Sequence, residues 1–173
     1  MSLREPSQSG RPLAALARFV NRSARPAPAE VCEMCASELA SGHSHIVNIE
    51  SRSLMCACRA CYLLFTQQGA AQGKYKAVPD RYLTLSSFAL TPARWEDLQI
   101  PVGMAFFFFN SALNRVTGFY PSPAGATESL LPLEAWQNLA AANPILETIE
   151  TDVEALLINR RRGGNFESYL VPI

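Results

Sequence analysis

The stretch SLMCACRACYLLF (residues 53–65) places three cysteines within six positions, at Cys56, Cys58 and Cys61. A second motif, CEMC (residues 32–35), precedes it in the chain. All five cysteines of the protein lie in these two motifs. Burial in a hydrophobic core does not explain such clustering. We therefore expect the cysteines to share a chemical role and the surrounding chain to fold around it.

Two Cys-x-x-Cys pairs, Cys32/Cys35 and Cys58/Cys61, predict a four-cysteine metal site. Each pair makes a tight turn that leaves both sulfurs on one side, and two such turns together build a tetrahedral cage of four sulfurs. The pairs are separated by 22 residues, slightly more than the typical spacing of about 15–20 residues, which one longer hairpin loop accommodates. The sequence therefore predicts a metal ribbon over residues 31–66.

The fifth cysteine and two histidines leave the ligand set open. Cys56 lies two positions before Cys58 on a predicted strand, so it faces either the metal or the core beneath it. It is either a small buried residue beside the site or a competing ligand or redox-active thiol. His43 and His45 lie between the cysteine pairs, and either can replace one sulfur of a zinc site. The predicted ligands are Cys32, Cys35, Cys58 and Cys61, with Cys56, His43 and His45 as substitutes.

Zinc and iron are the two candidate metals. Zinc is the commonest occupant of such a cage and has no redox chemistry, whereas iron in the same cage transfers electrons. Rubredoxins usually carry glycine directly after each cysteine pair, but Ala36 and Tyr62 stand there in this chain. We therefore expect a structural zinc site closed by four thiolates, with iron as the alternative. The odd number of cysteines and the lack of a secretion signal argue against disulfides.

Composition and charge describe a globular chain without a general attraction to polyanions. Of its 173 residues, 49% are hydrophobic and 17% are charged, as is typical of folded proteins. Fifteen basic residues balance fifteen acidic ones, so no overall field favours nucleic acid or an anionic membrane. The most apolar run, residues 100–109, is too short to span a bilayer, and no signal peptide is recognised. A cytoplasmic protein is expected.

Three regions follow from the pattern along the chain. Residues 1–30 are expected to form a short amphipathic helix, at residues 13–20, and a proline-rich linker. The metal ribbon comes next. Residues 66–80 are rich in Gln, Gly and Ala, so we expect them to be a connection. An α+β domain is expected over residues 79–173.

The expected fold class is α+β, with an antiparallel sheet of about four or five strands and one or two helices packed on one face. Thr91 and Pro92 are expected to be the N-cap and first residue of one helix, and residues 131–144 form another. Residues 119–132 are expected to be a loop. Strands are expected at residues 45–50 and 53–57 in the ribbon, and at 81–90, 103–110, 114–121, 154–161 and 167–173 in the domain.

The larger domain offers no convincing catalytic set. Residues 79–173 contain neither cysteine nor histidine, so nucleophile and base pairs of the usual kind are not available there. The chain contains no Walker loop and no GxGxxG motif. We therefore do not expect an enzyme.

Several longer phrases of the chain carry a resemblance. They are CEMC (32–35), SLMCACRACYLLF (53–65), VPDRY (78–82), WEDLQIPVGMAFFFFNSA (95–112), GFYPSPAGATESLLPLEAW (118–136) and ESYLVPI (167–173). Together they resemble an uncharacterised bacterial family often encoded beside NiFe hydrogenase genes. The resemblance implies an accessory or maturation role for a hydrogenase. Members of that family are expected to continue with a further helical segment past the position of Ile173.

Three functional hypotheses remain at this point. The first is a non-catalytic zinc-ribbon accessory or assembly protein that docks on a hydrogenase subunit or maturation factor through the cluster Arg160–Arg162 and the N-terminal helix. The second is a rubredoxin-like electron-transfer protein with iron in the same cage. The third is a zinc-ribbon nucleic-acid-binding regulator, since Arg59 lies inside the second cysteine turn, although the neutral net charge counts against it.

Overall fold

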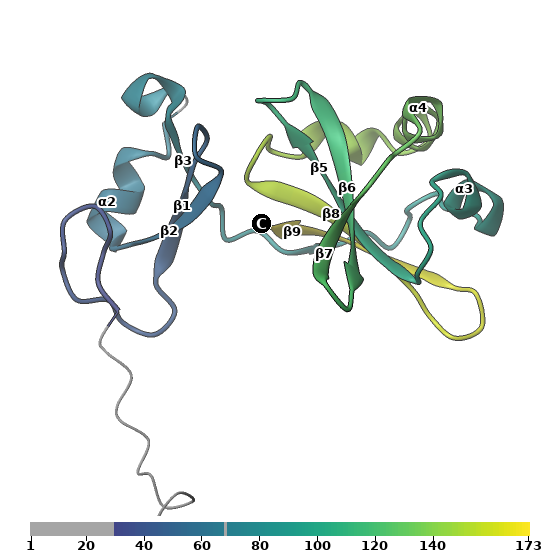
Figure 1. Cartoon of the computed structure of the whole chain (residues 1–173), viewed down its shortest axis with the longest axis horizontal. Helices are drawn as coiled ribbons and strands as arrows, with labels where there is room; N and C mark the ends of the chain where they lie inside the picture. Colours follow the sequence, from purple (N-terminus) through teal and green to yellow (C-terminus); the bar gives the residue numbers. More distant parts are fainter. Residues whose placement is uncertain (1–29, 68) are drawn as a thin grey trace, which may run out of the picture.

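A hairpin of alternating apolar and polar residues frames the smaller of two units (Figure 1). The structure is a computed structural model that describes residues 30–67 and 69–173. The predicted N-terminal helix and linker over residues 1–30 lie almost entirely outside the described residues. The unit comprises β1 (Ser44–Asn48), β2 (Ser53–Ala57), a short helix α2 (Arg59–Leu64), a 3-10 turn η2 (Ala70–Gly73) and β3 (Tyr75–Ala77).

The predicted turn between β1 and β2 is confirmed. The side-chain oxygen of Asn48 accepts hydrogen bonds from the backbone N–H groups of Glu50 and Ser51, both at 3.1 Å, and so closes the turn in the way typical of asparagine. Arg52 then takes a positive φ of 56°. The resulting register places His45 directly opposite Cys56.

The connection predicted for residues 66–80 contains a strand. β3 pairs antiparallel with the free edge of β1 and gives a three-stranded sheet in the order β2-β1-β3. Only three residues take part, and the preceding turn has Ala71 and Gln72 at positive φ. A strand this short, entered through an irregular turn, leaves almost no alternation for a sequence pattern to detect.

A six-stranded antiparallel sheet forms the larger unit, in the order β4-β9-β8-β5-β6-β7. This makes the protein α+β as expected, but richer in strands than the sequence suggested. The strands are β4 (Leu83–Thr84), β5 (Met104–Asn110), β6 (Arg115–Ser122), β7 (Gly125–Ser129), β8 (Glu154–Arg160) and β9 (Phe166–Pro172). The helical elements are α3 (Pro92–Asp97), α4 (Leu133–Ala141) and the 3-10 turn η3 (Pro144–Thr148).

Two expectations for the larger unit are corrected. Residues 119–132 are not a loop, because β7 turns back at Gly125 and pairs with β6. Pro121 and Pro123 made the sequence resemble a loop, because proline usually interrupts a strand. Here proline is tolerated, since it lies at an edge pair and near a turn. Of residues 81–90, only Leu83 and Thr84 form a strand, paired with β9.

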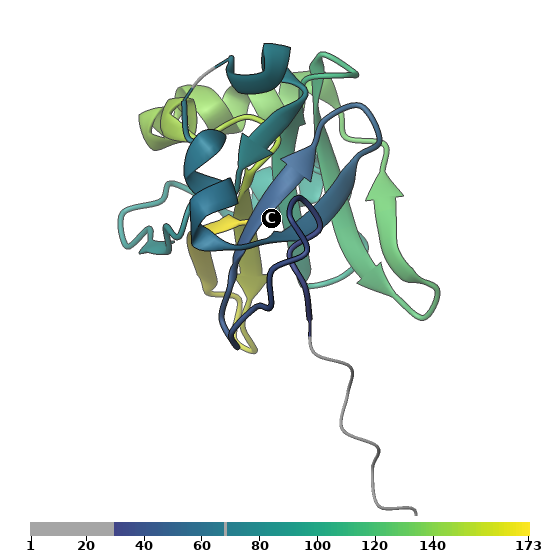
Figure 2. The same ribbon diagram turned by 90° about the vertical axis from the view of Figure 1, so that its left-hand side faces the viewer.

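Helices α3 and α4 cover one face of the larger sheet, and the small unit lies toward the other face (Figures 1 and 2). The predicted Thr91 cap is confirmed, with its hydroxyl accepting from the N–H of Arg94 at 3.3 Å. Trp95 of α3 is buried, and Trp136 of α4 packs on Phe107 with ring centroids 5.6 Å apart. The core beneath the helices consists of Trp95, Leu98, Ile100, Ala105, Phe107, Leu139, Leu146, Leu156 and Ile158.

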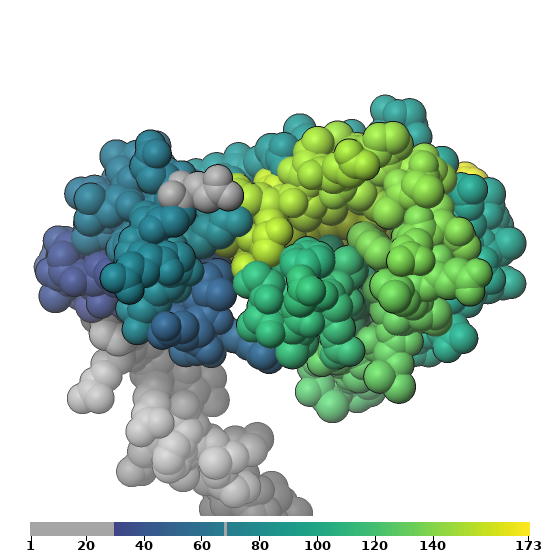
Figure 3. Space-filling view, turned by 90° about the horizontal axis from the view of Figure 1, so that it is seen from above, coloured from purple at the N-terminus to yellow at the C-terminus, as the bar shows by residue number. Residues whose placement is uncertain are grey.

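A small shared core and polar contacts of Lys76 join the two units. Val47 of β1, Val78 after β3 and Val153 before β8 pack together and are buried. Lys76 of β3 donates to the backbone carbonyl of Thr151 at 2.7 Å. Seen from above, the two units lie side by side in contact (Figure 3). The unit that carries the cysteines is therefore physically attached to the large sheet.

A bidentate ion pair fixes the connecting segment after β3 to the larger sheet. Arg81 donates from Nε to one oxygen of Glu154 at 2.7 Å and from Nη2 to the other oxygen. Its Nη2 also reaches the carbonyl of Thr148. The Glu154 side chain is only 1% exposed, so it depends on these donors. Within the described residues, no helix is long and apolar enough to cross a membrane.

Candidate metal centre

The first cysteine pair lies in a tight loop before β1. The loop is closed by a hydrogen bond from the N–H of Ala36 to the carbonyl of Cys32 at 2.7 Å, and another from the N–H of Cys32 to the carbonyl of Ser37 at 2.8 Å. Ala36 has a positive φ of 61°, a conformation in which glycine is favoured. The loop is attached to the hairpin by Glu33, whose N–H donates to the carbonyl of Cys56.

The second cysteine pair lies where β2 ends and α2 begins, so it follows a strand as the sequence predicts. Cys58 follows β2 in an extended conformation and is the N-cap of α2, and its sulfur accepts from the N–H of Cys61 at 3.5 Å. Cys61 lies in the first turn of that helix. A residue three positions after the N-cap returns to the same side of the chain, so the two sulfurs point together.

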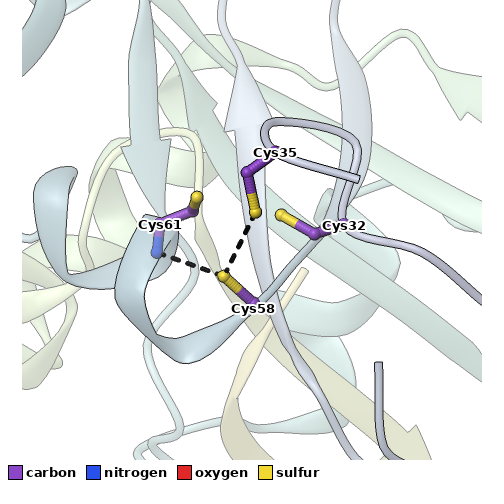
Figure 4. A group of neighbouring side chains, drawn as sticks. All are labelled: Cys32, Cys35, Cys58 and Cys61. Carbon is purple, nitrogen blue, oxygen red and sulfur yellow. Dashed lines mark hydrogen bonds between the residues drawn. The ribbon is translucent and has the colours of Figure 1, made fainter. Parts of the chain in front are cut away.

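The four sulfurs meet between the loop, the end of β2 and the start of α2 (Figure 4). Those of Cys32, Cys35, Cys58 and Cys61 all lie within 4.8 Å of one another. The sulfurs of Cys35 and Cys58 are 3.7 Å apart. Zinc–sulfur bonds of about 2.3 Å in a tetrahedron require sulfurs about 3.8 Å apart. This donor set fits a tetrahedral metal ion.

Ionisation of these thiols favours a bound cation. The pKa of Cys32 is lowered to about 6, chiefly by a hydrogen bond from the backbone of Cys58, and that of Cys35 is lowered, chiefly by the hydroxyl of Ser37. The pKa of Cys61 is raised to about 12, chiefly by a hydrogen bond with the side chain of Cys35 and next by one with that of Cys58. Cys32 and Cys35 therefore ionise readily, whereas Cys61 holds its proton in hydrogen bonds with the neighbouring sulfurs. A divalent cation bound among the sulfurs favours the thiolate form of each.

The substitute ligands named from sequence are placed in a group of their own. His43, His45 and Cys56 offer ligand atoms within 4.8 Å of one another. His43 precedes β1, His45 is on β1 and Cys56 is on β2. The side chain of His43 is only 11% exposed. The seven residues predicted from the sequence as ligands of one metal thus form two separate groups, one of four cysteines and one of two histidines and a cysteine.

Two polar residues of the site had not been singled out from the sequence. The hydroxyl oxygen of Ser37 lies 3.0 Å from the sulfur of Cys35. The carboxylate of Glu33 accepts a hydrogen bond from the N–H of Cys56 at 2.7 Å. Both belong to the loop that carries the first cysteine pair, and proximity to the motif was the only signal available in the sequence. All five cysteines are free thiols.

Two of the three arginines in the basic cluster predicted as a docking edge make contacts within the protein, and one of them is in an ion pair. Arg160–Arg162 lie exposed at the turn between β8 and β9. The guanidinium of Arg160 stacks over the ring of Phe166 at 5.7 Å. Arg161 donates to Glu167 at 2.7 Å, and this contact lowers the pKa of Glu167. The turn therefore presents less free positive charge than the sequence suggests.

Comparison with known families identifies a match over most of the chain. The model of a family of unknown function (DUF5947) matches residues 31–173, which include both cysteine motifs and the whole larger sheet. No curated protein and no solved structure matches the chain.

Proposed function

The chain belongs to DUF5947, a family of unknown function, and for this protein we propose a non-catalytic accessory or assembly role built on a structural zinc ion. The proposed ligands are Cys32, Cys35, Cys58 and Cys61. One observation carries the proposal, namely that four cysteine sulfurs lie within 4.8 Å of one another. Four thiolates complete the coordination of zinc and leave no position for a substrate, which is the mark of a structural site.

A structural role also agrees with the size of the unit that holds the cage. Its buried core comprises few residues and includes one of the ligands; the members are Cys32, Ile46, Ala57, Tyr62, Phe65 and Ala77. Modules with so little apolar burial usually need a metal or disulfides to fold. Binding energy at the cage would supply that stability.

Metal analysis with an absorption spectrum tests the metal. We expect about one zinc ion per chain in the four-sulfur cage and no colour from it. The protein should be purified from its native host, because overexpression can load zinc into iron sites. Iron with thiolate charge-transfer bands would contradict the zinc assignment. It would favour the rubredoxin-like alternative, which the surface exposure of Cys35 makes worth testing.

A pair of matched variants tests the ligand set. Cys35→Ser removes one proposed ligand and is expected to abolish the four-thiolate signal of the cobalt-substituted protein and lower its melting temperature. Cys56→Ser makes the same chemical change outside the four-sulfur group and should keep that signal. A Cys35→Ser protein with unchanged cobalt spectrum and melting temperature would show that the cage is assigned to the wrong residues.

A NiFe hydrogenase component is the proposed partner. This part of the proposal is supported by the resemblance of the chain's long phrases to a family often encoded beside hydrogenase genes. Affinity capture of the full chain from hydrogenase-expressing native cells, followed by mass spectrometry, should enrich a hydrogenase subunit or maturation factor. The Cys35→Ser variant serves as the comparison bait. Capture without any hydrogenase component would remove the partner from the proposal.

A further inference from the structure

A second group of metal-ligating side chains lies beside the four-sulfur cage. His43, His45 and Cys56 have ligand atoms within 4.8 Å of one another, and the group shares no member with the cage. The hairpin itself brings them together. His45 and Cys56 are directly opposite in the pairing of β1 with β2, so their side chains share one face of the sheet. His43 lies two positions before His45, and the ring centroids are 4.7 Å apart.

The hydrogen bonds of His43 leave one ring nitrogen free for a ligand. Its Nδ1 lies 3.2 Å from the carbonyl oxygen of Ala40 and 3.4 Å from a carboxylate oxygen of Glu30. Both neighbours are acceptors, so Nδ1 carries the proton and donates it. In the neutral imidazole, Nε2 then holds the lone pair. A carbonyl or carboxylate behind the imidazole is the arrangement that orients histidine ligands in metal sites.

The Nε2 atom of His43 has no hydrogen-bond partner among the residues that the structure describes, although it is buried. The side chain as a whole is 11% exposed. A buried polar atom without a partner costs about 1–3 kcal/mol. A metal ion bound to Nε2 removes that cost. The orphaned atom is therefore a second observation, independent of the clustering, that points to a ligand.

We propose that His43, His45 and Cys56 form a second metal site, for Zn²⁺ or a similar divalent first-row transition ion. Two imidazoles and one thiolate are the borderline ligands that such ions prefer, whereas magnesium and calcium prefer oxygen. The thiolate leaves the bound ion with one net positive charge. Carboxylates of Glu30 and Glu33 lie close by, one at His43 and the other on the backbone N–H of Cys56, and their charge complements it.

Three protein ligands leave one position of a tetrahedral ion open, unlike the closed cage next to it. The open position accepts water, a small anion or a side chain of a binding partner. This site goes beyond the structural role proposed above, since an exchangeable position can bind something. It also gives Cys56 and both histidines a role that a ribbon with one metal does not require.

Cobalt titration of the untagged, reduced full chain, stripped of metal under anaerobic conditions, tests the second site. Co²⁺ reports each site separately, because charge-transfer intensity rises with the number of thiolate ligands. We expect the wild-type protein to bind about two cobalt ions per chain, one with the spectrum of four thiolates and one with that of a single thiolate. The Cys35→Ser variant should lose the first signal.

Two variants aimed at the second site give the decisive comparison. His45→Gln and Cys56→Ser should each reduce cobalt binding from about two ions to about one, and should leave the four-thiolate band intact. That intact band shows that the small unit is still folded. A wild-type protein that binds only one ion, or variants that still bind two, would overturn the second site. Neither result would affect the four-cysteine cage, so failure of the two proposals can be told apart.

Discussion

Ala36 occupies a backbone conformation that favours glycine. Its φ of 61° closes the loop that holds Cys32 and Cys35, and a side chain in the left-handed region costs about 1–2 kcal/mol. We predict that Ala36→Gly raises the free energy of unfolding of the metal-bound protein by about 1 kcal/mol, measured by chemical denaturation. The gain is reduced by the extra freedom that glycine gives the unfolded chain.

Ala60→Gly is the matched control for this substitution. Ala60 is exposed within α2, so the same change should lower stability by about 0.5–1 kcal/mol. Equal effects of the two substitutions would show that the loop conformation of Ala36 carries no strain.

The cysteine spacing made the four-sulfur group predictable, whereas the arrangement of the histidines could not be read from the sequence. Two Cys-x-x-Cys pairs fix a local turn each, and metal chemistry supplies the reason for them to meet. His43, in contrast, is defined by contacts with Glu30 and Ala40 on a loop and by the pairing of β1 with β2. Such contacts depend on the register of the folded strands, and no repeating pattern in the sequence marks them.

At the scale of elements, the packing of β5 against β6 depends on a glycine. Phe107 and Gly118 are directly opposite in the register, and a Cβ atom at Gly118 would lie 2.9 Å from the Phe107 ring. Phe107 is fully buried and has little room to move. We predict that Gly118→Ala lowers the free energy of unfolding by about 1–3 kcal/mol, measured by denaturant titration.

A double mutant provides the check on this explanation. Phe107→Leu removes the ring that the new methyl group would meet, so adding Gly118→Ala to it should cost less than it does in the wild-type background. Additive effects of the two changes would mean that the clash is not the cause.

Long elements were predictable and short edge elements were not. β5, β8 and α4 each span at least seven residues and carry strong apolar patterns. β3, β4 and β7 are edge strands of their sheets. Edge strands bury little, contain polar and small residues and tolerate nearby proline. Their pairing is set by the sheet they join, so the sequence showed a connection where β3 lies, a loop where β7 lies and too long a strand at β4.

At the scale of the whole molecule, the ion pair between Arg81 and Glu154 fixes the connection between the units. Arg81→Ala leaves a buried carboxylate without its bidentate donor, so we predict a loss of about 3 kcal/mol of stability, measured by denaturation at neutral pH. Arg115→Ala breaks the exposed pair with Glu128, in which both side chains are well solvated. This control should cost less than about 1 kcal/mol. Similar losses from the two variants would contradict a special role for Arg81.

Removal of metal should destabilise the small unit and leave the stability of the larger sheet unchanged. The small unit has a minor core of its own, whereas the larger sheet has a separate core beneath its helices. We predict that chelation speeds amide hydrogen exchange in β1, β2 and α2 by at least about tenfold and leaves β5 and β8 unchanged. Mass spectrometry of peptides from each unit measures this. An equal increase in both sheets would show that the two units fold as one body.

The positions of the two tryptophans give the protein a built-in optical reporter. The chain contains only two. Trp95 is a buried residue of α3 and Trp136 of α4 packs on Phe107, so indole emission follows the larger unit alone. Cobalt absorption follows the small unit alone. The two optical signals therefore report on the two units separately. An effect of metal binding on the larger sheet would appear as a change in tryptophan emission, without an attached dye.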